Sequence, residues 1–422
     1  MERYAIVGFG CAGYHCARSL RENGFNGEIH VYTDTGRAPE NPMLTTYVTA
    51  GRLPEEAGCP FGSLENITRN LGLTVHPGRV SLVSPADMEV RSQSGRAAVY
   101  DKLLVSTGAR AFVPPMDGQD SPSAYTMRTM DDARRLRARL ERGDVKSAVV
   151  VGASMVGIKV VELLRQRGVD CTLSDMAPHI FPLAAFDTVA AEIERRLERA
   201  GVALAFGRGI SGLRDRSEGG VSVLLSDGSC VACDIAVLCI GTRPNLELLP
   251  PGALSRDRGG ILVDETMESS VPGVYAAGDC ASCTNLQTGV PQAVGLWANA
   301  GRQGDVAGAS MAGVRDVYEG NLVHNITHFM DMDFISLGDR GLPGEHRVYS
   351  RRDGGLWLEA TTDGGELRCV NILDCKEISG IVRGLLLRQL RGGGAPDILL
   401  LEKLRRSGVD GAFIKLLEGE VQ

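Results

Sequence analysis

The sequence predicts an α/β fold that contains two Rossmann-like units. Two glycine-rich turns support this prediction, because each follows a short apolar strand and begins a helix with apolar spacing. The first glycines of the two turns, Gly8 and Gly152, lie about 144 residues apart in a chain of 422 residues. A chain of this length has room for two or three domains.

The first turn follows the apolar run at residues 4–7. Gly8, Gly10 and Gly13 have the spacing G-x-G-x-x-G. One glycine allows the tight turn, one lets the backbone approach a pyrophosphate, and one lets the helix pack close to the strand. The pyrophosphate would lie at the helix N-terminus, where N–H groups and the helix dipole favour an anion. Asp34 ends the next strand and is placed to accept hydrogen bonds from a ribose.

The second turn departs from this pattern at its middle position. Gly152 and Gly157 occupy the outer positions, and Ser154 stands where a glycine is expected. Serine is small, so a close approach of the backbone to a ligand stays possible. Asp175 ends the next strand and favours a ribose 2′-hydroxyl, and therefore NADH, because its carboxylate would repel a 2′-phosphate. No arginine occurs in residues 176–182.

The composition excludes several other classes of function. The formal net charge of −7 argues against general nucleic-acid binding and against a polybasic membrane patch. We expect no targeting segment, and the sequence has no apolar stretch long enough to span a membrane. The 11 cysteines are scattered and odd in number, which is typical of reduced thiols. We therefore expect a cytoplasmic protein.

Three further apolar strands end in short polar or glycine-containing turns, and a turn followed by a helix comes after them. The turns are Thr107-Gly108-Ala109, the stretch from Gly241 to Asn245, and Gly278-Asp279, and the last turn and helix occupy residues 289–308. In this order the motifs resemble the two-dinucleotide-binding-domain flavoproteins of the pyridine nucleotide–disulfide oxidoreductase superfamily. The resemblance covers roughly residues 3–310.

This resemblance implies a domain organisation and a set of cofactor contacts. An NADH-binding domain, residues 117–245, would be inserted in an FAD-binding domain formed by residues 1–116 and 246–319. Residues 320–422 would form a small α+β interface domain, most similar to the branch of ferredoxin and rubredoxin reductases and of nitrite reductase flavin segments. The expected FAD contacts are Gly8, Gly10, Gly13, Asp34, Val80, Thr107, Gly108, Ala109, Gly278, Asp279 and Trp297. The expected NADH contacts are Gly152, Ser154, Gly157, Asp175 and Gly241.

The cysteines do not fit the disulfide-reducing members of this superfamily. Those members carry cysteines beside the flavin, whereas the matching residues 37–54 contain none. Two C-x-x-C pairs occur elsewhere, Cys230 with Cys233 and Cys280 with Cys283. Each could be a redox disulfide or half of a metal site, but neither has a second pair at zinc-ligand spacing. We expect small buried residues there and no metal site.

His324 and His328 form an H-x3-H pair in a segment rich in β-favouring residues. In a strand the two rings would share a face but lie roughly 13 Å apart, too far for one metal ion. We expect packing at an interface or towards the flavin; contact with a substrate or partner and a metal site are the alternatives.

Lys159 and Thr46 differ from the resembling branch at what would be one contact. In that branch a loop lysine reaches towards the flavin and pairs with a glutamate of the second turn's helix. Thr46, four residues after Pro42, stands at the lysine position, and Lys159 stands at the glutamate position. We expect Lys159 to supply the cation that stabilises an anionic reduced flavin. The alternative is a lysine whose stem packs at a domain interface while its ammonium is in solvent. The expected catalytic residues are Lys159, Pro42 and Thr46.

Together these features predict an FAD-dependent NADH oxidoreductase. Hydride would pass from NADH to FAD, and electrons would pass on to a redox protein such as a ferredoxin, a rubredoxin or a larger iron–sulfur or haem enzyme. One alternative is an NADH-dependent small-molecule reductase or NADH oxidase. Another is a flavoprotein subunit of a larger redox complex, for which the apolar C-terminal helix could be a docking surface. A homodimer is common in the resembling superfamily and is expected here.

Overall fold

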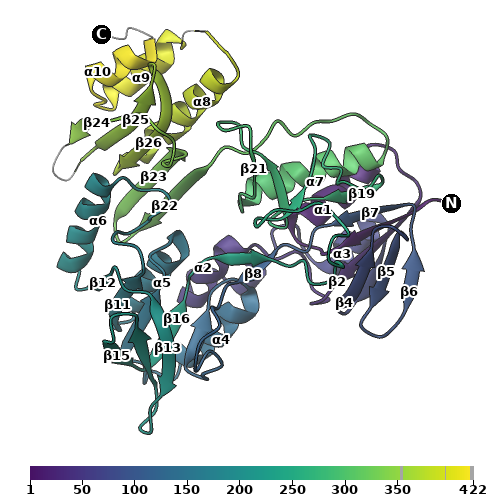
Figure 1. Ribbon diagram of the computed structural model, residues 1–422, viewed down its shortest axis with the longest axis horizontal. Helices are drawn as coiled ribbons and strands as arrows, with labels where there is room; N and C mark the ends of the chain where they lie inside the picture. The colour runs from purple at the N-terminus through teal and green to yellow at the C-terminus, as the bar shows by residue number, and fades with distance from the viewer. Residues whose placement is uncertain (352–354, 395, 419–422) are drawn as a thin grey trace. The chain divides into compact units, whose positions relative to one another are not determined.

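The computed structural model describes residues 1–351, 355–394 and 396–418 (Figure 1). These residues form two compact units. The first unit comprises Met1–Phe112, Arg128–Arg137 and Thr242–Asn321, and the second comprises Val113–Met127, Ala138–Gly241 and Leu322–Gln422.

The three-domain division expected from the sequence stays a prediction. The first unit contains residues 128–137, which were expected in the NADH-binding domain. The second unit combines residues 138–241 with the C-terminal residues that were expected to form a separate interface domain. The α/β fold class with parallel Rossmann-like sheets is confirmed in both units.

The first unit is built on a parallel sheet with the strand order β19-β7-β1-β2-β3. Four residues of β1 are buried, as expected for a strand covered on both faces. The second strand ends at Thr33, so that Asp34 follows it directly. The strands are β1 (Arg3–Val7), β2 (Glu28–Thr33), β3 (Leu73–Pro77), β7 (Lys102–Val105) and β19 (Val274–Ala276).

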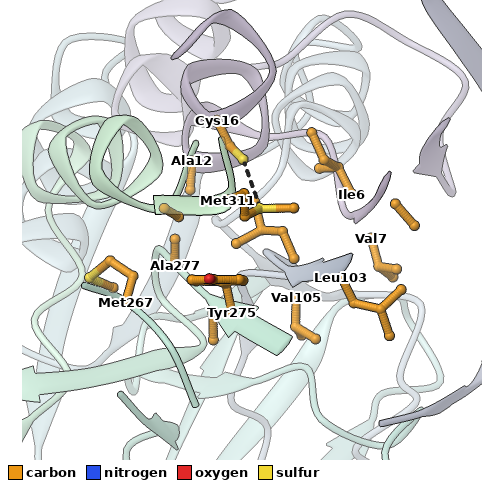
Figure 2. Close-up of a cluster of buried hydrophobic side chains, with 14 of the residues drawn as sticks. Ile6, Val7, Ala12, Cys16, Leu103, Val105, Met267, Tyr275, Ala277 and Met311 are labelled. Carbon is orange, nitrogen blue, oxygen red and sulfur yellow. Dashed lines mark hydrogen bonds between the residues drawn. The ribbon is translucent and has the colours of Figure 1, made fainter. Parts of the chain in front are cut away.

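Helices α1 (Cys11–Glu22) and α7 (Trp297–Met311) pack against each other. Glycines on α7 permit this close approach: a Cβ at Gly304 would lie 2.3 Å from the Ala12 carbonyl oxygen. Figure 2 shows the apolar side chains between the helices and the sheet, where the Cys16 thiol lies 3.7 Å from the Met311 sulfur. The turn and helix predicted over residues 289–308 are confirmed, with the helix as α7.

The remaining elements of the first unit are short. The antiparallel pair of β8 and β17 joins backbone segments that are distant in sequence. The small sheets contain β4 (Val80–Ser84), β5 (Glu89–Ser92) and β6 (Ala97–Val99); β8 (Ala109–Ala111) and β17 (Thr242–Pro244); and β18 (Ile261–Leu262), β20 (Ala281–Thr284) and β21 (Pro291–Gln292). The other helices are η1 (Pro42–Leu44), α2 (Thr45–Ala50), η2 (Glu55–Gly58), α3 (Leu64–Leu71) and the start of α4 (Met130–Leu140).

The second unit contains another parallel sheet, with the order β12-β11-β10-β16-β9. As the sequence predicts, a strand, a glycine turn and a helix follow one another here as β10 and α5. The elements are β9 (Ala124–Thr126), β10 (Ser147–Val151), α5 (Met155–Arg165), β11 (Asp170–Asp175), α6 (Asp187–Arg199), β12 (Ala203–Phe206) and β16 (Ile235–Leu238), with an antiparallel sheet of β13 (Ile210–Asp215), β14 (Val221–Leu225) and β15 (Cys230–Cys233).

The C-terminal part of the second unit is an antiparallel sheet with the order β22-β23-β26-β25-β24. Its terminal helices pack on this sheet: the Phe413 ring lies 5.1 Å from the Tyr349 ring, and Val382 and Leu386 are fully buried. In the ranges that the structure describes, no helix is long and apolar enough to cross a membrane. The elements are β22 (His324–Phe329), β23 (Met332–Gly338), β24 (Glu345–Arg351), β25 (Trp357–Asp363), β26 (Glu366–Leu373), η3 (Lys376–Ile378), α8 (Ser379–Leu390), α9 (Ile398–Arg406) and α10 (Gly411–Glu418).

The contact between α1 and α7 gives a first prediction. Gly304→Ala is expected to lower the free energy of unfolding by about 1–3 kcal/mol, because the new methyl group meets backbone that cannot move aside. Gly301→Ala is the matched control on the same helix, since its methyl group would meet a side chain, the His15 ring at 3.2 Å, and no backbone atom nearer than that. Urea denaturation followed by circular dichroism measures both. Equal losses in the two variants would contradict this account of the packing.

Candidate functional site

The first glycine turn is shaped by two close backbone contacts. Gly8 has a φ of 98°, and a Cβ there would lie 2.3 Å from the Ser106 carbonyl oxygen. A Cβ at Gly13 would lie 2.3 Å from the Gly8 carbonyl oxygen. These two glycines are therefore required by the fold, one for the turn and one for helix packing, as the sequence predicts.

Gly10 is different, because apart from its chain neighbours no protein atom lies within 4 Å of the position of its Cβ. Its φ of −92° is open to any residue, so that the fold itself does not require glycine here. Gly10 is the N-cap of α1 and has no side chain that could bind the first N–H groups of the helix. The turn thus leaves space and hydrogen-bond donors where a pyrophosphate would approach the backbone.

The segment Thr107-Gly108-Ala109 is fixed by Asn245. The Thr107 hydroxyl donates to the Asn245 carbonyl at 2.7 Å, and the Asn245 side chain donates to the Thr107 carbonyl at 2.9 Å. The Asn245 N–H donates to the Gly108 carbonyl at 2.9 Å. Two of the predicted motifs, far apart in sequence, are therefore brought together by reciprocal hydrogen bonds.

Asp279 has a partner that the sequence reasoning missed. Arg128 donates to the Asp279 carboxylate at 2.5 Å and to the Ala109 carbonyl at 3.0 Å. Arg128 thus links two segments expected near FAD. The sequence signal for it was its position, as a basic residue between β9 and α4, two residues after the end of the strand. Gly278, beside Asp279, has a φ of 83° and donates its N–H to Gln303.

The loop expected beside the flavin contains buried hydroxyl groups in place of thiols. Thr45 and Thr46, the first residues of α2, are 2 % and 6 % exposed. The Thr45 hydroxyl donates to the Pro42 carbonyl at 2.9 Å. The structure also places Cys59 near this loop, because the Asn41 N–H donates to the carbonyl of the preceding Gly58. Burial raises the pKa of the Cys59 thiol, which disfavours a reactive thiolate.

The other expected FAD contacts lie at the ends of elements. Asp34 is exposed directly after β2, Val80 is the first residue of β4, and Trp297 is the first residue of α7. The Trp297 ring stacks on Phe61 at 5.8 Å, and Phe61 stacks on Tyr14 of α1 at 3.9 Å. These residues belong to the first unit, and their contact with FAD stays a prediction.

The second turn repeats the backbone geometry of the first. Gly152 has a φ of 107°, and a Cβ there would lie 2.3 Å from the Cys239 carbonyl oxygen. A Cβ at Gly157 would lie 1.9 Å from the Gly152 carbonyl oxygen. Gly241 has a φ of 100° and open space at its Cβ position. The second turn has therefore kept the glycines that its fold requires.

Ser154 has a role that its position in the motif did not reveal. It is the N-cap of α5, and its hydroxyl accepts a hydrogen bond from the Gly157 N–H at 3.2 Å and donates to the Cys239 carbonyl at 3.1 Å. Gly10 occupies the same place on α1. The serine therefore stabilises the helix start and uses one of the N–H groups that an anion could bind.

Asp175 holds the second turn through its carboxylate. It accepts from the Ala153 N–H at 2.7 Å and from the Ala177 N–H at 2.8 Å. A carboxylate has about four acceptor positions, so these bonds leave capacity for ribose hydroxyls. Its predicted role as selector for NADH is compatible with this geometry and stays a prediction.

Lys159 lies on α5 and is 8 % exposed. Its ammonium donates to the Glu162 carboxylate and, at 2.8 Å, to the His328 carbonyl. Glu162, 5 % exposed, also accepts from the Met330 N–H at 3.3 Å. The pair therefore binds α5 to the turn between β22 and β23. The alternative placed the Lys159 ammonium in solvent, but the side chain is buried. Its role towards the flavin stays a prediction.

The expectation of buried residues in the two C-x-x-C pairs is confirmed at Cys233, Cys280 and Cys283 but is wrong at Cys230, which is exposed. Cys280 and Cys283 are buried, with pKa values raised by burial, and Cys233 is buried while Cys230 is exposed at the other end of β15. All the cysteines are free thiols. His324 and His328 lie on strand β22, as predicted, and His328 contacts Asp333 at 2.8 Å. Within the described ranges, no group of three potential ligands could hold a metal ion.

Comparison with known proteins gives these two turns a family. Residues 2–304 match the pyridine nucleotide-disulphide oxidoreductase family. The chain belongs to this family. The resemblance found in the sequence is therefore confirmed, and with it the class of enzyme, an oxidoreductase that uses FAD and NADH.

Two curated relatives and one solved structure illustrate the range of the family. The chain is 31 % identical over 315 residues to the biphenyl dioxygenase system ferredoxin–NAD(+) reductase component of Paraburkholderia xenovorans, covering 74 % of this chain and 75 % of the relative. It is 30 % identical over 357 residues to the epsilon subunit of NADH-dependent phenylglyoxylate dehydrogenase of Aromatoleum evansii, covering 83 % and 82 %. Its fold is similar to that of water-forming NADH oxidase from Lactobacillus brevis, with a TM-score of 0.88, 21 % identity and coverage of 100 % and 98 %.

The first turn yields a test that separates folding from cofactor binding. Gly10→Ala is expected to cost about 1 kcal/mol or less of apoprotein stability, but to lower FAD affinity about tenfold or more, because the methyl group fills the space that a pyrophosphate needs. Flavin fluorescence titration and thermal denaturation of the apoprotein measure the two effects. Gly13→Ala is the control, since its methyl group would meet the Gly8 carbonyl and lower stability itself. Normal FAD binding by Gly10→Ala would place the cofactor elsewhere.

Lys159 yields a test of its two possible roles. Lys159→Met removes the ammonium that lies against the buried Glu162 carboxylate and is expected to cost about 3–5 kcal/mol of stability. The double variant, which adds Glu162→Gln, also removes the negative charge of the Glu162 carboxylate and is expected to recover part of the lost stability. If Lys159 serves only docking, the rate of flavin reduction recovers with stability in the double variant. If it stabilises the reduced flavin, the rate stays low in both variants. Stopped-flow absorbance and thermal denaturation separate these outcomes.

Proposed function

We propose that this protein is an FAD-containing NADH reductase that passes electrons to a redox protein such as a ferredoxin or rubredoxin. The observation that carries the proposal is the loop of residues 37–54, which contains no cysteine in a family named for disulfide chemistry. Thr45 and Thr46 are buried there instead. Without a cysteine in this loop, no thiol relay is expected there, and electrons would pass from the flavin directly to an acceptor outside the chain. The relative that reduces ferredoxin supports this class of acceptor.

Bound FAD would supply the chemistry of accepting hydride and releasing electrons singly. The residues of the first unit provide its setting. The α1 N-terminus, capped by Gly10, offers N–H groups to a pyrophosphate, and Asp34 offers a carboxylate to a ribose. Arg128 and Asp279 form a charge pair between segments expected near the cofactor. The thiols of Cys280 and Cys283 are buried and held as neutral thiols by their raised pKa values.

The residues of the second unit support binding of the nicotinamide nucleotide. The turn from Gly152 to Gly157 keeps the backbone close approach, and Asp175 stands at the end of the next strand. A carboxylate at this place favours the 2′-hydroxyl of NADH over the 2′-phosphate of NADPH. Arg208 lies nearby, but its guanidinium is 3.3 Å from Asp227. We therefore propose NADH as the donor.

One relative favours a second candidate function. The phenylglyoxylate dehydrogenase relative is named as the epsilon subunit, which makes it one part of a larger enzyme. By this reading our chain is the NADH-reactive flavoprotein subunit of a redox complex, and its acceptor is a neighbouring subunit. A second protein that co-purifies in fixed stoichiometry with the native protein would support this candidate. The homodimer and the cytoplasmic location expected from the sequence stay predictions.

The proposal is tested by anaerobic stopped-flow mixing of the FAD-loaded protein with NADH or NADPH, followed at the flavin absorbance. We expect reduction by NADH to be at least about tenfold faster at equal low concentrations, because Asp175 repels the 2′-phosphate. Asp175→Asn is expected to narrow this difference, whereas the control Arg208→Ala leaves it unchanged. No reduction by either nucleotide would refute the proposed donor.

The acceptor is tested in the same preparation. With NADH, a [2Fe–2S] ferredoxin or a rubredoxin, and cytochrome c as the final acceptor, we expect cytochrome c reduction to exceed oxygen consumption about tenfold or more. Omitting the small redox protein is the control. Oxygen consumption that equals NADH oxidation, with no dependence on the added protein, would favour the NADH oxidase alternative and contradict the proposal.

A further inference from the structure

One segment of the second unit, residues 176–186, connects Asp175 to α6 and contacts the second glycine turn. Its Phe181 has a left-handed backbone, with φ 52°, and is 2 % exposed. The Phe181 N–H donates to the Ala153 carbonyl at 2.9 Å, and the Ala153 N–H donates to the Asp175 carboxylate at 2.7 Å. Both backbone groups of Ala153 are therefore fixed, one of them by this segment.

The C-terminal sheet presents a row of buried polar side chains. Ser336 on β23, Asn371 on β26 and Glu359 on β25 are neighbours in register across three strands. Asn371 and Glu359 are 0 % exposed, and Ser336 is 1 % exposed. Burying polar and charged groups in this way is costly unless they are hydrogen-bonded. The row therefore needs hydrogen-bond partners.

The segment supplies partners for the centre of the row. The Asn371 side chain donates to the Ala184 carbonyl at 3.0 Å and accepts from the Phe186 N–H at 2.8 Å. The Ser336 hydroxyl donates to the same Ala184 carbonyl at 3.0 Å. One amide and one hydroxyl of the sheet thus bind two backbone groups of the segment, the Ala184 carbonyl and the Phe186 N–H.

The start of α6 supplies partners for the end of the row. Glu359 accepts hydrogen bonds from the Thr188 hydroxyl and, at 3.2 Å, from the Val189 N–H. A buried carboxylate at a helix N-terminus is stabilised by free N–H groups and by the helix dipole. His346 contacts the same carboxylate at 3.1 Å. Glu359 therefore fixes the end of the segment where α6 begins.

Aromatic packing anchors the middle of the segment on the same sheet. The Phe181 ring stacks on Phe334 of β23, with centroids 5.0 Å apart and planes 8° apart. Phe329 of β22 meets the Phe181 ring edge at 5.6 Å. Both of these phenylalanines are 0 % exposed. Phe181, whose N–H binds the glycine turn, therefore packs with its ring against the C-terminal sheet.

We propose that the C-terminal sheet positions the NADH site and that Asn371 is the central positioning residue. This inference rests on the proposed binding of NADH at the turn from Gly152 to Gly157. Asn371 binds the Ala184 carbonyl and the Phe186 N–H. The Ala184 and Ala185 N–H groups donate to the Phe181 carbonyl at 2.8 and 2.9 Å, and the Phe181 N–H donates to the Ala153 carbonyl. The turn thereby keeps the shape that accepts the nucleotide without having to become ordered when the nucleotide binds.

The test uses Asn371→Leu, which keeps a similar volume but removes both hydrogen bonds. It leaves the Phe186 N–H buried without an acceptor, a defect that the segment can relieve only by moving. We expect NAD⁺ affinity, measured by calorimetry on the FAD-loaded protein, to fall about tenfold. Hydrogen–deuterium exchange is expected to rise in residues 152–158 and 176–186. The FAD content is expected to stay at the wild-type level.

Gln389→Leu is the matched control. The Gln389 side chain also makes two backbone bonds, accepting from the Leu367 N–H at 2.8 Å and donating to the Leu367 carbonyl at 3.1 Å. These bonds join α8 to β26 and do not involve residues 176–186. We expect a comparable loss of stability in this variant, with NAD⁺ affinity within about twofold of wild type. Unchanged affinity in Asn371→Leu, or equal weakening in both variants, would overturn the proposal.

Two further measurements keep the result interpretable. If Asn371→Leu does not fold, Asn371→Asp replaces it, since the carboxylate still accepts from the Phe186 N–H but cannot donate to Ala184. Unchanged NAD⁺ affinity in that variant, together with faster exchange in residues 176–186, would overturn the proposal equally. Wild-type protein that neither binds NAD⁺ nor is reduced by NADH would refute the proposed function itself. Wild-type binding with an unaffected Asn371 variant would refute only this inference.

Discussion

A close approach between a glycine and the carbonyl oxygen beyond a neighbouring strand is the constraint on which both units depend. It occurs at Gly8 against Ser106 and again at Gly152 against Cys239, and in each case a Cβ would lie 2.3 Å from the oxygen. Because any side chain there would push the strands apart, the turn, the helix after it and the parallel sheet form one geometric unit. At each turn this packing brings the helix N-terminus to the end of the sheet, where we propose that a dinucleotide binds.

Much of this arrangement could be predicted from the sequence, because glycine spacing, strand hydrophobicity and the acid at the strand end report on local backbone geometry. The strands and helices around Gly8 and Gly152 are where the pattern predicts them. The contacts of Arg128 and Asn245 could not be predicted, because their partners, Asp279 and Thr107, lie far away in the chain and meet them only in the tertiary fold. The role of Ser154 as an N-cap was missed because its residue type was compared with a motif, although serine is among the favoured N-cap residues.

Lys159 shows how a substitution in a motif can be understood only with its neighbours. From the sequence, a lysine in place of a glutamate indicates a displaced charge. In the structure Glu162, one helical turn further, neutralises that charge, and the pair satisfies the backbone of the turn between β22 and β23. Together with the row of Ser336, Asn371 and Glu359, this contact explains why residues 138–241 and the C-terminal residues form one compact unit. Polar contacts, which sequence periodicity does not report, join these two parts.

The two helix starts have different consequences for the exchange of bound groups. At α1 the N-cap is Gly10, and a bound anion displaces only water from the first N–H groups. At α5 the Ser154 hydroxyl already accepts from the Gly157 N–H, so that an arriving anion competes with a bond that the protein makes to itself. When the anion leaves, that bond closes again, which favours departure. The same turn geometry therefore suits a tightly bound group at α1. At α5 it suits a group that has to dissociate after every catalytic cycle.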